Sequence, residues 1–339
     1  MNSYPPVGSL SPPSPARPLA RRSLERLKLS ANFQPIVVII LVMFFSIYAG
    51  YRNGDFWSGL NWQLLVQPLA EAGLVSVGMM FVIASGGIDL SVGSIVGVSA
   101  IVAALGAHHG WPVRGMEAAA LATGVICGAF NGLLIGWVRL SPILVTLGTM
   151  ILFSGIGLAL SSGASFAGFP DGLLWWNDAA VFGFPVEILV FFVVIAIAGI
   201  LLHATLCGQY VVAIGSNGEA ARYSGFPVRL TLFAVYSLQG LLCGAAGVLL
   251  MARLASARAD MGQGLMLVAI TAVVLGGAPI EGGFASLLGT VAGVSAFYIM
   301  QNGLLLLGVP AFVQYALTSA LLLVAVGIGN LMRGHGEEE

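Results

Sequence analysis

Residues 82–98 read VIASGGIDLSVGSIVGV, and they place a Gly-Gly pair and one acid, Asp89, within a long apolar stretch. Adjacent glycines interrupt a helix. In lipid, a chain must satisfy its own amide groups, so interrupted backbone is tolerated only where protein or a water-filled path surrounds it. The stretch therefore indicates a transport path rather than a simple membrane anchor.

The composition of the whole chain is typical of a membrane protein. Of its 339 residues, 58% are hydrophobic and 8% are charged, against about 25% charged in a soluble domain. The 46 glycines agree, because small residues allow close approach of transmembrane helices. We predict an all-α polytopic membrane protein with glycine-broken helices.

A transmembrane helix needs about 20 apolar residues, and ten stretches approach that length. They lie approximately at 35–50, 62–85, 89–106, 117–138, 142–162, 186–203, 229–252, 262–277, 284–307 and 311–332. Flanking this transmembrane domain at 35–332, we expect a disordered Pro-rich and basic tail at 1–34 and a short tail at 333–339.

The basic residues suggest an orientation for these spans. With ten spans and the N-terminus inside, nine Lys and Arg residues lie inside and four outside. Cytoplasmic loops carry the excess of positive charge, so both termini are expected in the cytoplasm. Five of the nine come from the N-terminal tail, which makes the support from internal loops modest.

A second stretch resembles the first. Residues 85–100 read SGGIDLSVGSIVGVSA, and residues 275–296 read LGGAPIEGGFASLLGTVAGVSA. Each has a glycine break, one acid and a small-residue helix. Broken segments in corresponding positions point to the pathway of a transporter, although glycine-rich helices can also look alike by chance.

The segment at 208–228, GQYVVAIGSNGEAARYSGFPV, is predicted to contain a short cytoplasmic helix. Ser216 and Glu219 have the spacing of a capping box, and Gly225 and Pro227 supply a left-handed stop and a breaker. So short a helix is marginal alone in water. It is expected to pack either on the protein's own membrane face or on a partner.

Each polar residue in the spans has two possible roles, one structural and one functional. Asp89 is expected chiefly to cap a helix start, with direct contact to cargo as the alternative. Glu71, within a span, is the acid best placed for proton coupling. Candidates for a polar substrate path are Asn131, Thr146, Gln239, Gln301 and Asn302. Each of them could instead make an interhelical hydrogen bond.

Several functions are disfavoured. The only lysine, Lys28, follows no glycine-rich loop, so the chain has no P-loop for ATP. No catalytic triad or metal-ligand spacing is found among the four histidines and three cysteines, and no basic cluster outside the tail suits nucleic acid. We therefore expect neither an enzyme nor a resident cofactor or metal.

Three segments together resemble the permease subunits of ribose-type bacterial ABC sugar importers. They read SGGIDLSVGS at 85–94, SPILVTLGTMILFSGIGLALSSG at 141–163 and AIGSNGEAARYSG at 213–225. The first signature comprises Gly86, Gly87, Asp89, Ser91 and Gly93. The resemblance runs from about residue 35 to residue 332.

The resemblance implies a multi-pass permease of about ten helices in the bacterial inner membrane. It implies a second permease copy or a paralogue, a cytoplasmic ATPase that holds ATP and Mg, and a periplasmic solute-binding protein that largely selects the solute. It also identifies a coupling helix that docks on the ATPase, formed by Asn217, Glu219, Ala220, Ala221, Arg222 and Gly225.

The chain departs from the family pattern at three places. Met266 and Val268 stand where a glutamate and an aspartate are frequent, and Cys207 and Gln209 stand in a stretch that often holds arginine. The later glycine-rich stretch reads GGAPIEGGFAS instead of the family's usual serine-containing form. We expect the apolar stretch around Met266 to alter which solute the protein transports. The alternative functions are a secondary transporter coupled to protons or sodium, and a structural or receptor-like membrane protein.

Overall fold

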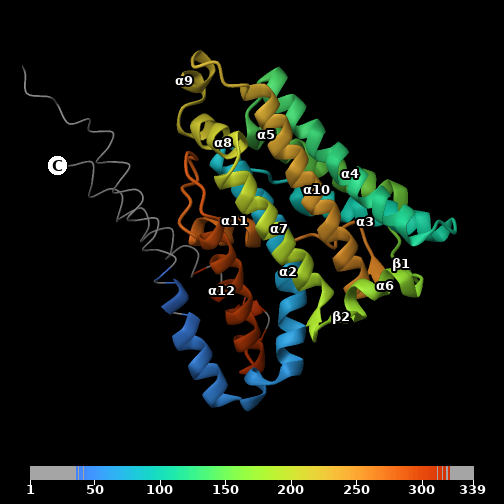
Figure 1. Ribbon diagram of the computed structural model, residues 1–339. Helices are drawn as coiled ribbons and strands as arrows, with labels where there is room; N and C mark the ends of the chain where they lie inside the picture. The colour runs from blue at the N-terminus through green and yellow to red at the C-terminus, as the bar shows by residue number, and fades with distance from the viewer. Residues whose placement is uncertain are drawn as a thin grey trace, which may run out of the picture.

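The computed structural model describes residues 36, 38–40, 42–310, 312–314, 316, 317 and 320. The tails expected at 1–34 and 333–339 lie outside the described residues, as does most of the span expected at 311–332. The described part is a bundle of helices with four strands of two residues each (Figure 1). The all-α class is therefore confirmed.

Six of the described helices are long and apolar enough to cross a membrane. They are α2 (Gly59–Ala84), α4 (Val113–Leu133) with its π-helical extension η2 (Leu134–Val138), α5 (Pro142–Ser161), α7 (Val186–His203), α10 (Val228–Leu254) and α12 (Leu287–Leu306). Four apolar helices are shorter: Val38–Arg52, α3 (Val92–His108), α8 (Leu206–Ser216) and α11 (Leu265–Leu275).

The remaining elements are small and connect these helices. They are η1 (Gly54–Trp57), α6 (Asp171–Asp178), α9 (Gly218–Tyr223), β1 (Phe166–Ala167), β2 (Ala180–Val181), β3 (Phe184–Pro185) and β4 (Ser256–Ala257). Strand β1 pairs antiparallel with β4, and β2 pairs antiparallel with β3.

The span expected at 262–277 is wrong. Helix α11 has 11 residues, which rise about 16 Å, whereas the hydrocarbon core is about 30 Å thick. The chain before it, residues 255–264, is mostly irregular and runs along α3. A Cβ at Gly93 would lie 2.6 Å from the carbonyl oxygen of Gly262. The expected count of ten full spans is therefore not confirmed.

Glycines bring α4 and α10 into backbone contact. A Cβ added at Gly128 would overlap the carbonyl oxygen of Tyr236, and one at Gly132 would lie 2.7 Å from the Cα of Phe233. Small residues four positions apart allow such close packing in lipid, where helix association depends on van der Waals contact. The two helices lie side by side in Figure 1.

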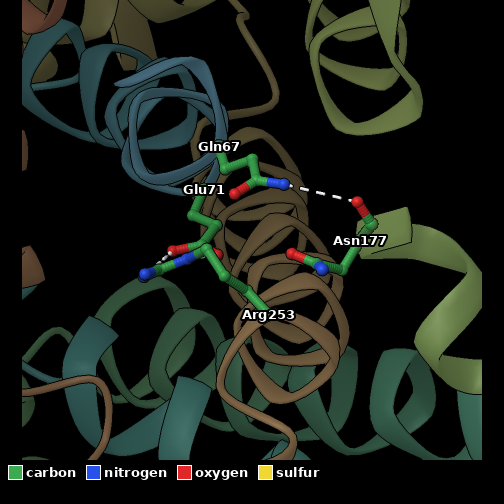
Figure 2. Close-up of polar contacts among 4 residues, drawn as sticks. All are labelled: Gln67, Glu71, Asn177 and Arg253. Atoms are coloured by element: carbon green, nitrogen blue, oxygen red, sulfur yellow. Dashed lines mark hydrogen bonds and ion pairs between the residues drawn. The ribbon is translucent and has the colours of Figure 1, made fainter. Parts of the chain in front are cut away.

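An ion pair with a buried carboxylate joins α2 to α10. Arg253, in the last turn of α10, donates from Nε and Nη2 to the two carboxylate oxygens of Glu71 at 2.6 and 2.8 Å. Figure 2 shows this pair, and Gln67 one turn earlier on α2 donating to the carbonyl oxygen of Asn177 in α6 at 3.3 Å. Glu71 was the acid expected to be best placed for proton coupling. Its two carboxylate oxygens are instead paired with Arg253.

Replacing Arg253 with alanine should destabilise the protein strongly. Glu71 is 1% exposed, and removing one partner of a buried ion pair costs about 3–5 kcal/mol because the other charge stays unpaired. Thermal unfolding in detergent measures the effect. The matched control is Arg258→Ala, which removes an exposed partner of Asp260 and should change stability little. Equal effects of the two substitutions would contradict this account.

Gly128→Ala should lower stability by about 1–3 kcal/mol, the usual cost of overpacking. Gly148→Ala in α5 is the control, because a Cβ there meets nothing within 4 Å. Unfolding by heat, followed by intrinsic fluorescence, compares the variants. If Gly128→Ala were as stable as Gly148→Ala, close α4–α10 packing would not be needed.

Candidate functional site

The first break, residues 85–91 between α2 and α3, is held by its own side chains. Gly86 has φ of 84°, a conformation that glycine adopts without strain. The Asp89 carboxylate accepts hydrogen bonds from the Ser91 amide at 2.8 Å and the Ser91 hydroxyl at 2.6 Å. Asp89 thus satisfies a free amide at the helix start, as expected, although Ser91 is itself the N-cap residue.

Two neighbouring helices brace this break. Asn131 of α4 donates to the Ser91 hydroxyl oxygen at 2.8 Å, and Thr146 of α5 donates to the carbonyl oxygen of Ile88 at 3.0 Å. Both side chains are fully buried. Their structural role is therefore to fix the interrupted backbone, while their contact with a solute stays a prediction.

The other candidate path residues lie elsewhere. Gln239 of α10 is buried and donates to the carbonyl oxygen of Val75 at 3.4 Å. Asn302 exchanges hydrogen bonds of 2.8 and 3.0 Å with Asn61, and Gln301 precedes it on α12. Asn61 lies near the start of α2, about 35 Å along that helix from the first break. The five side chains do not converge on one place.

A partly open pocket of about 470 Å³ lies beside the first break. Its walls come from the start of α3, the middle of α5, the irregular chain before α11 and the first turn of α11. Gly93, Ser94, Ser154, Gln263 and Met266 are among the lining residues. Irregular backbone in a membrane protein is tolerated where it is buried in protein or lines a cavity, so this pocket is the candidate site for a solute. We call it the break pocket.

Met266 and Val268 differ in position. Met266 is half-buried and lines the break pocket, whereas Val268 does not line it and packs against the hydrophobic core. The polar pocket residues Ser154 and Gln263 were missed by the sequence analysis. Each is a single polar residue among apolar or small residues, which is the same signal that marked Thr146 in the sequence.

The coupling segment at 208–228 holds most of α8 and all of α9, and Asn217 alone separates the two helices. The expected capping box is wrong. The side chain of Asn217 accepts from the Ala220 amide at 2.9 Å, while the Ser216 hydroxyl donates back to the carbonyl oxygen of Val212 at 2.9 Å. Asn217 precedes the new helix directly, so its oxygen reaches the third residue on.

The expected left-handed stop at Gly225 is confirmed, with φ of 82°. The Gly225 amide donates to the carbonyl oxygen of Arg222 at 3.1 Å, and the Phe226 amide donates to that of Ala221 at 3.0 Å. These bonds satisfy carbonyl groups that a helix end leaves free. They fix where α9 ends and where the chain turns toward α10.

Helix α9 presents most of its surface outward. Ala221 is buried and anchors the helix to the protein, whereas Glu219, Ala220, Arg222 and Tyr223 are exposed. Tyr223 is 89% exposed, a position that the sequence analysis did not single out. In Figure 1, α9 lies at one end of the bundle. The arrangement leaves a polar helical surface free to contact a partner.

The described residues offer no alternative centre for metal chemistry. Within the described ranges, no three His, Cys, Asp or Glu side chains lie close enough together to hold a metal ion.

Comparison with known proteins assigns the class. The family described as branched-chain amino acid transport system, permease component, matches residues 68–326. The autoinducer 2 import system permease protein LsrD of Yersinia enterocolitica is 40% identical over 260 residues, 75% of this chain and 78% of its own. The LsrD protein of Escherichia coli is 39% identical over 272 residues, 78% of this chain and 82% of its own.

The LsrD protein of Photorhabdus laumondii is 39% identical over 260 residues, covering 75% of this chain and 78% of its own. No solved structure matches the chain significantly. The family match covers both glycine breaks, the break pocket and α9. The resemblance to importer permeases is thus confirmed, and the chain belongs to the family of transport-system permease components, whose members are multi-pass membrane subunits.

Proposed function

We propose that this permease imports a sugar or a related small polar solute, delivered by a periplasmic binding protein and driven by ATP on a separate subunit. The observation that carries the proposal is the combination, in one chain of this family, of an exposed α9 and a pocket at interrupted backbone. The relatives belong to autoinducer 2 import systems, so autoinducer 2 is the first solute to test.

The partner at α9 is a cytoplasmic ABC ATPase that holds ATP and Mg. This chain has no P-loop, since Lys28 is its only lysine. A short helix can occupy a groove on a partner through its exposed side chains. Helix α9 suits this use because Ala221 fixes it to the bundle while Glu219, Ala220 and Arg222 point away. ATPase contact at α9 implies that this end of the bundle is cytoplasmic, as are both termini.

A second permease, either another copy or a paralogue, completes the path. The break pocket is bounded on one side by α5, where Ile151 lines the pocket and is 67% exposed. Leu144 on the same helix is 71% exposed. A polar solute cannot cross beside lipid, so another protein chain must cover the open side of this pocket during transport.

The direct test is uptake into vesicles that contain the permease and the co-encoded ATPase. We expect uptake of labelled solute only with luminal ATP and the binding protein. Uptake driven by a proton or sodium gradient without ATP would instead establish the secondary transporter. The pairing of Glu71 with Arg253 favours the first outcome, because it occupies the acid best placed for ion coupling.

Ala220→Arg should block docking of the ATPase. A bulky charge on the exposed face of α9 should weaken ATPase recovery on the purified permease about thirtyfold, the effect of losing about 2 kcal/mol at an interface. The control is Asp171→Arg, which introduces the same side chain at an exposed position of α6. Full recovery with Ala220→Arg would remove α9 from the proposed interface.

Met266→Glu should change solute preference, because it adds a carboxylate to the wall of the break pocket. We expect the ratio of uptake rates for two sugars to shift about tenfold, the scale of one pocket contact. Met266→Leu keeps the wall apolar and should preserve the ratio. Unchanged rates for every sugar tested with Met266→Glu would show that this position does not contact the solute.

A further inference from the structure

The last turn of α8 lies against both glycine breaks at a single residue, Gly215. A Cβ added there would overlap the carbonyl oxygen of Ala84, the last residue of α2, and would lie 2.5 Å from the amide nitrogen of Gly283. A Cβ at Gly86, in the first break, would in turn lie 3.5 Å from the Cα of Gly215. Gly283 belongs to the second break, residues 276–286 between α11 and α12. Three segments distant in sequence thus meet through backbone atoms alone.

The two breaks also contact each other. The Gly283 amide donates to the carbonyl oxygen of Ala84 at 3.0 Å. A Cβ at Gly282 would lie 2.7 Å from the Cα of Gly86. Gly86, Gly282 and Gly283 all have positive φ, at 84°, 93° and 78°, which glycine alone adopts without strain. The likeness of the two breaks in sequence therefore corresponds to a direct contact in space.

This junction is connected to α9 by the shortest link available. Asn217 is the only residue between α8 and α9, and Ser216 packs on Gly283, with its hydroxyl 2.6 Å from a Cβ placed there. Figure 1 shows α8 and α9 at the end of the bundle where the loop between α11 and α12 lies. A displacement of α9 must therefore act on the junction without a flexible linker to absorb it.

The two breaks in turn hold two walls of the break pocket. The first break leads directly into Gly93 and Ser94 of α3, while the second follows α11, whose first turn carries Met266. Close-packed backbone shifts between discrete arrangements rather than deforming continuously. Movement of both breaks together would reposition both walls at once.

We propose that Gly215 is a positioning residue that couples α9 to the break pocket by holding both breaks against α8. The proposal rests on the proposed function, since it takes α9 as the ATPase contact. The competing explanation is that Gly215 only permits dense packing and has no part in transmitting motion. The two explanations predict different effects of a methyl group added at Gly215.

Gly215→Ala separates the two explanations in the reconstituted importer. We expect the ATPase to co-purify and hydrolyse ATP at the wild-type rate, while solute uptake per ATP falls about tenfold or more, a typical allosteric coupling. The matched control is Gly59→Ala at the start of α2, outside α9, the two breaks and the break pocket, where a Cβ meets nothing within 4 Å; its uptake per ATP should equal that of the wild type. Wild-type uptake per ATP in Gly215→Ala would overturn the proposal.

A measurement on the unaltered protein covers the case in which Gly215→Ala fails to fold. Hydrogen–deuterium exchange of the wild-type importer should show peptides containing Gly86 and Gly283 changing protection together when ATP is added. A change at α9 with no change at either break, or at one break only, would overturn the proposal. If wild-type vesicles show no ATP-dependent uptake, it is the proposed function itself that has failed.

Discussion

The constraint on which this structure depends is the need to satisfy the backbone groups where the helices of this membrane protein are interrupted. A helix meets this need internally, but the chain at residues 85–91 and 276–286 is not helical. The first break uses the Asp89 carboxylate, Asn131 and Thr146. At the second break, the Gly283 amide donates to the carbonyl oxygen of Ala84 at the end of α2. Side chains of α4 and α5 therefore hold the first interruption, and the end of α2 holds the second.

Glycine residues allow the close backbone contacts that hold these segments together. At Gly128, Gly215 and Gly262, a Cβ would overlap a backbone carbonyl of another segment. The first contact fixes α4 on α10, the second fixes α8 on the breaks, and the third fixes the chain before α11 on α3. The high glycine content is thus used for backbone contacts that position the break pocket and α9 relative to each other.

The sequence predicted the elements that have strong local signals. Long apolar runs gave α2, α5, α7 and α10 close to their observed bounds, and Gly225 marked the end of α9. The span expected at 262–277 was too long, because it included the glycine-rich residues 262–264 and 276–277, which lie outside α11. The capping box failed because Asn217, immediately after Ser216, caps α9 instead.

Long-range partners could not be predicted in the same way. Arg253 lies just beyond the span expected at 229–252, and nothing in its local sequence indicates Glu71, 182 residues away, as its partner. The contact of Gly215 with both breaks likewise depends on three remote segments. The structure of the assembled importer, determined with and without ATP, tests this junction most directly. The account predicts that α8 and both breaks move as a unit, keeping the bond from Gly283 to Ala84, and a displaced α8 beside stationary breaks would contradict it.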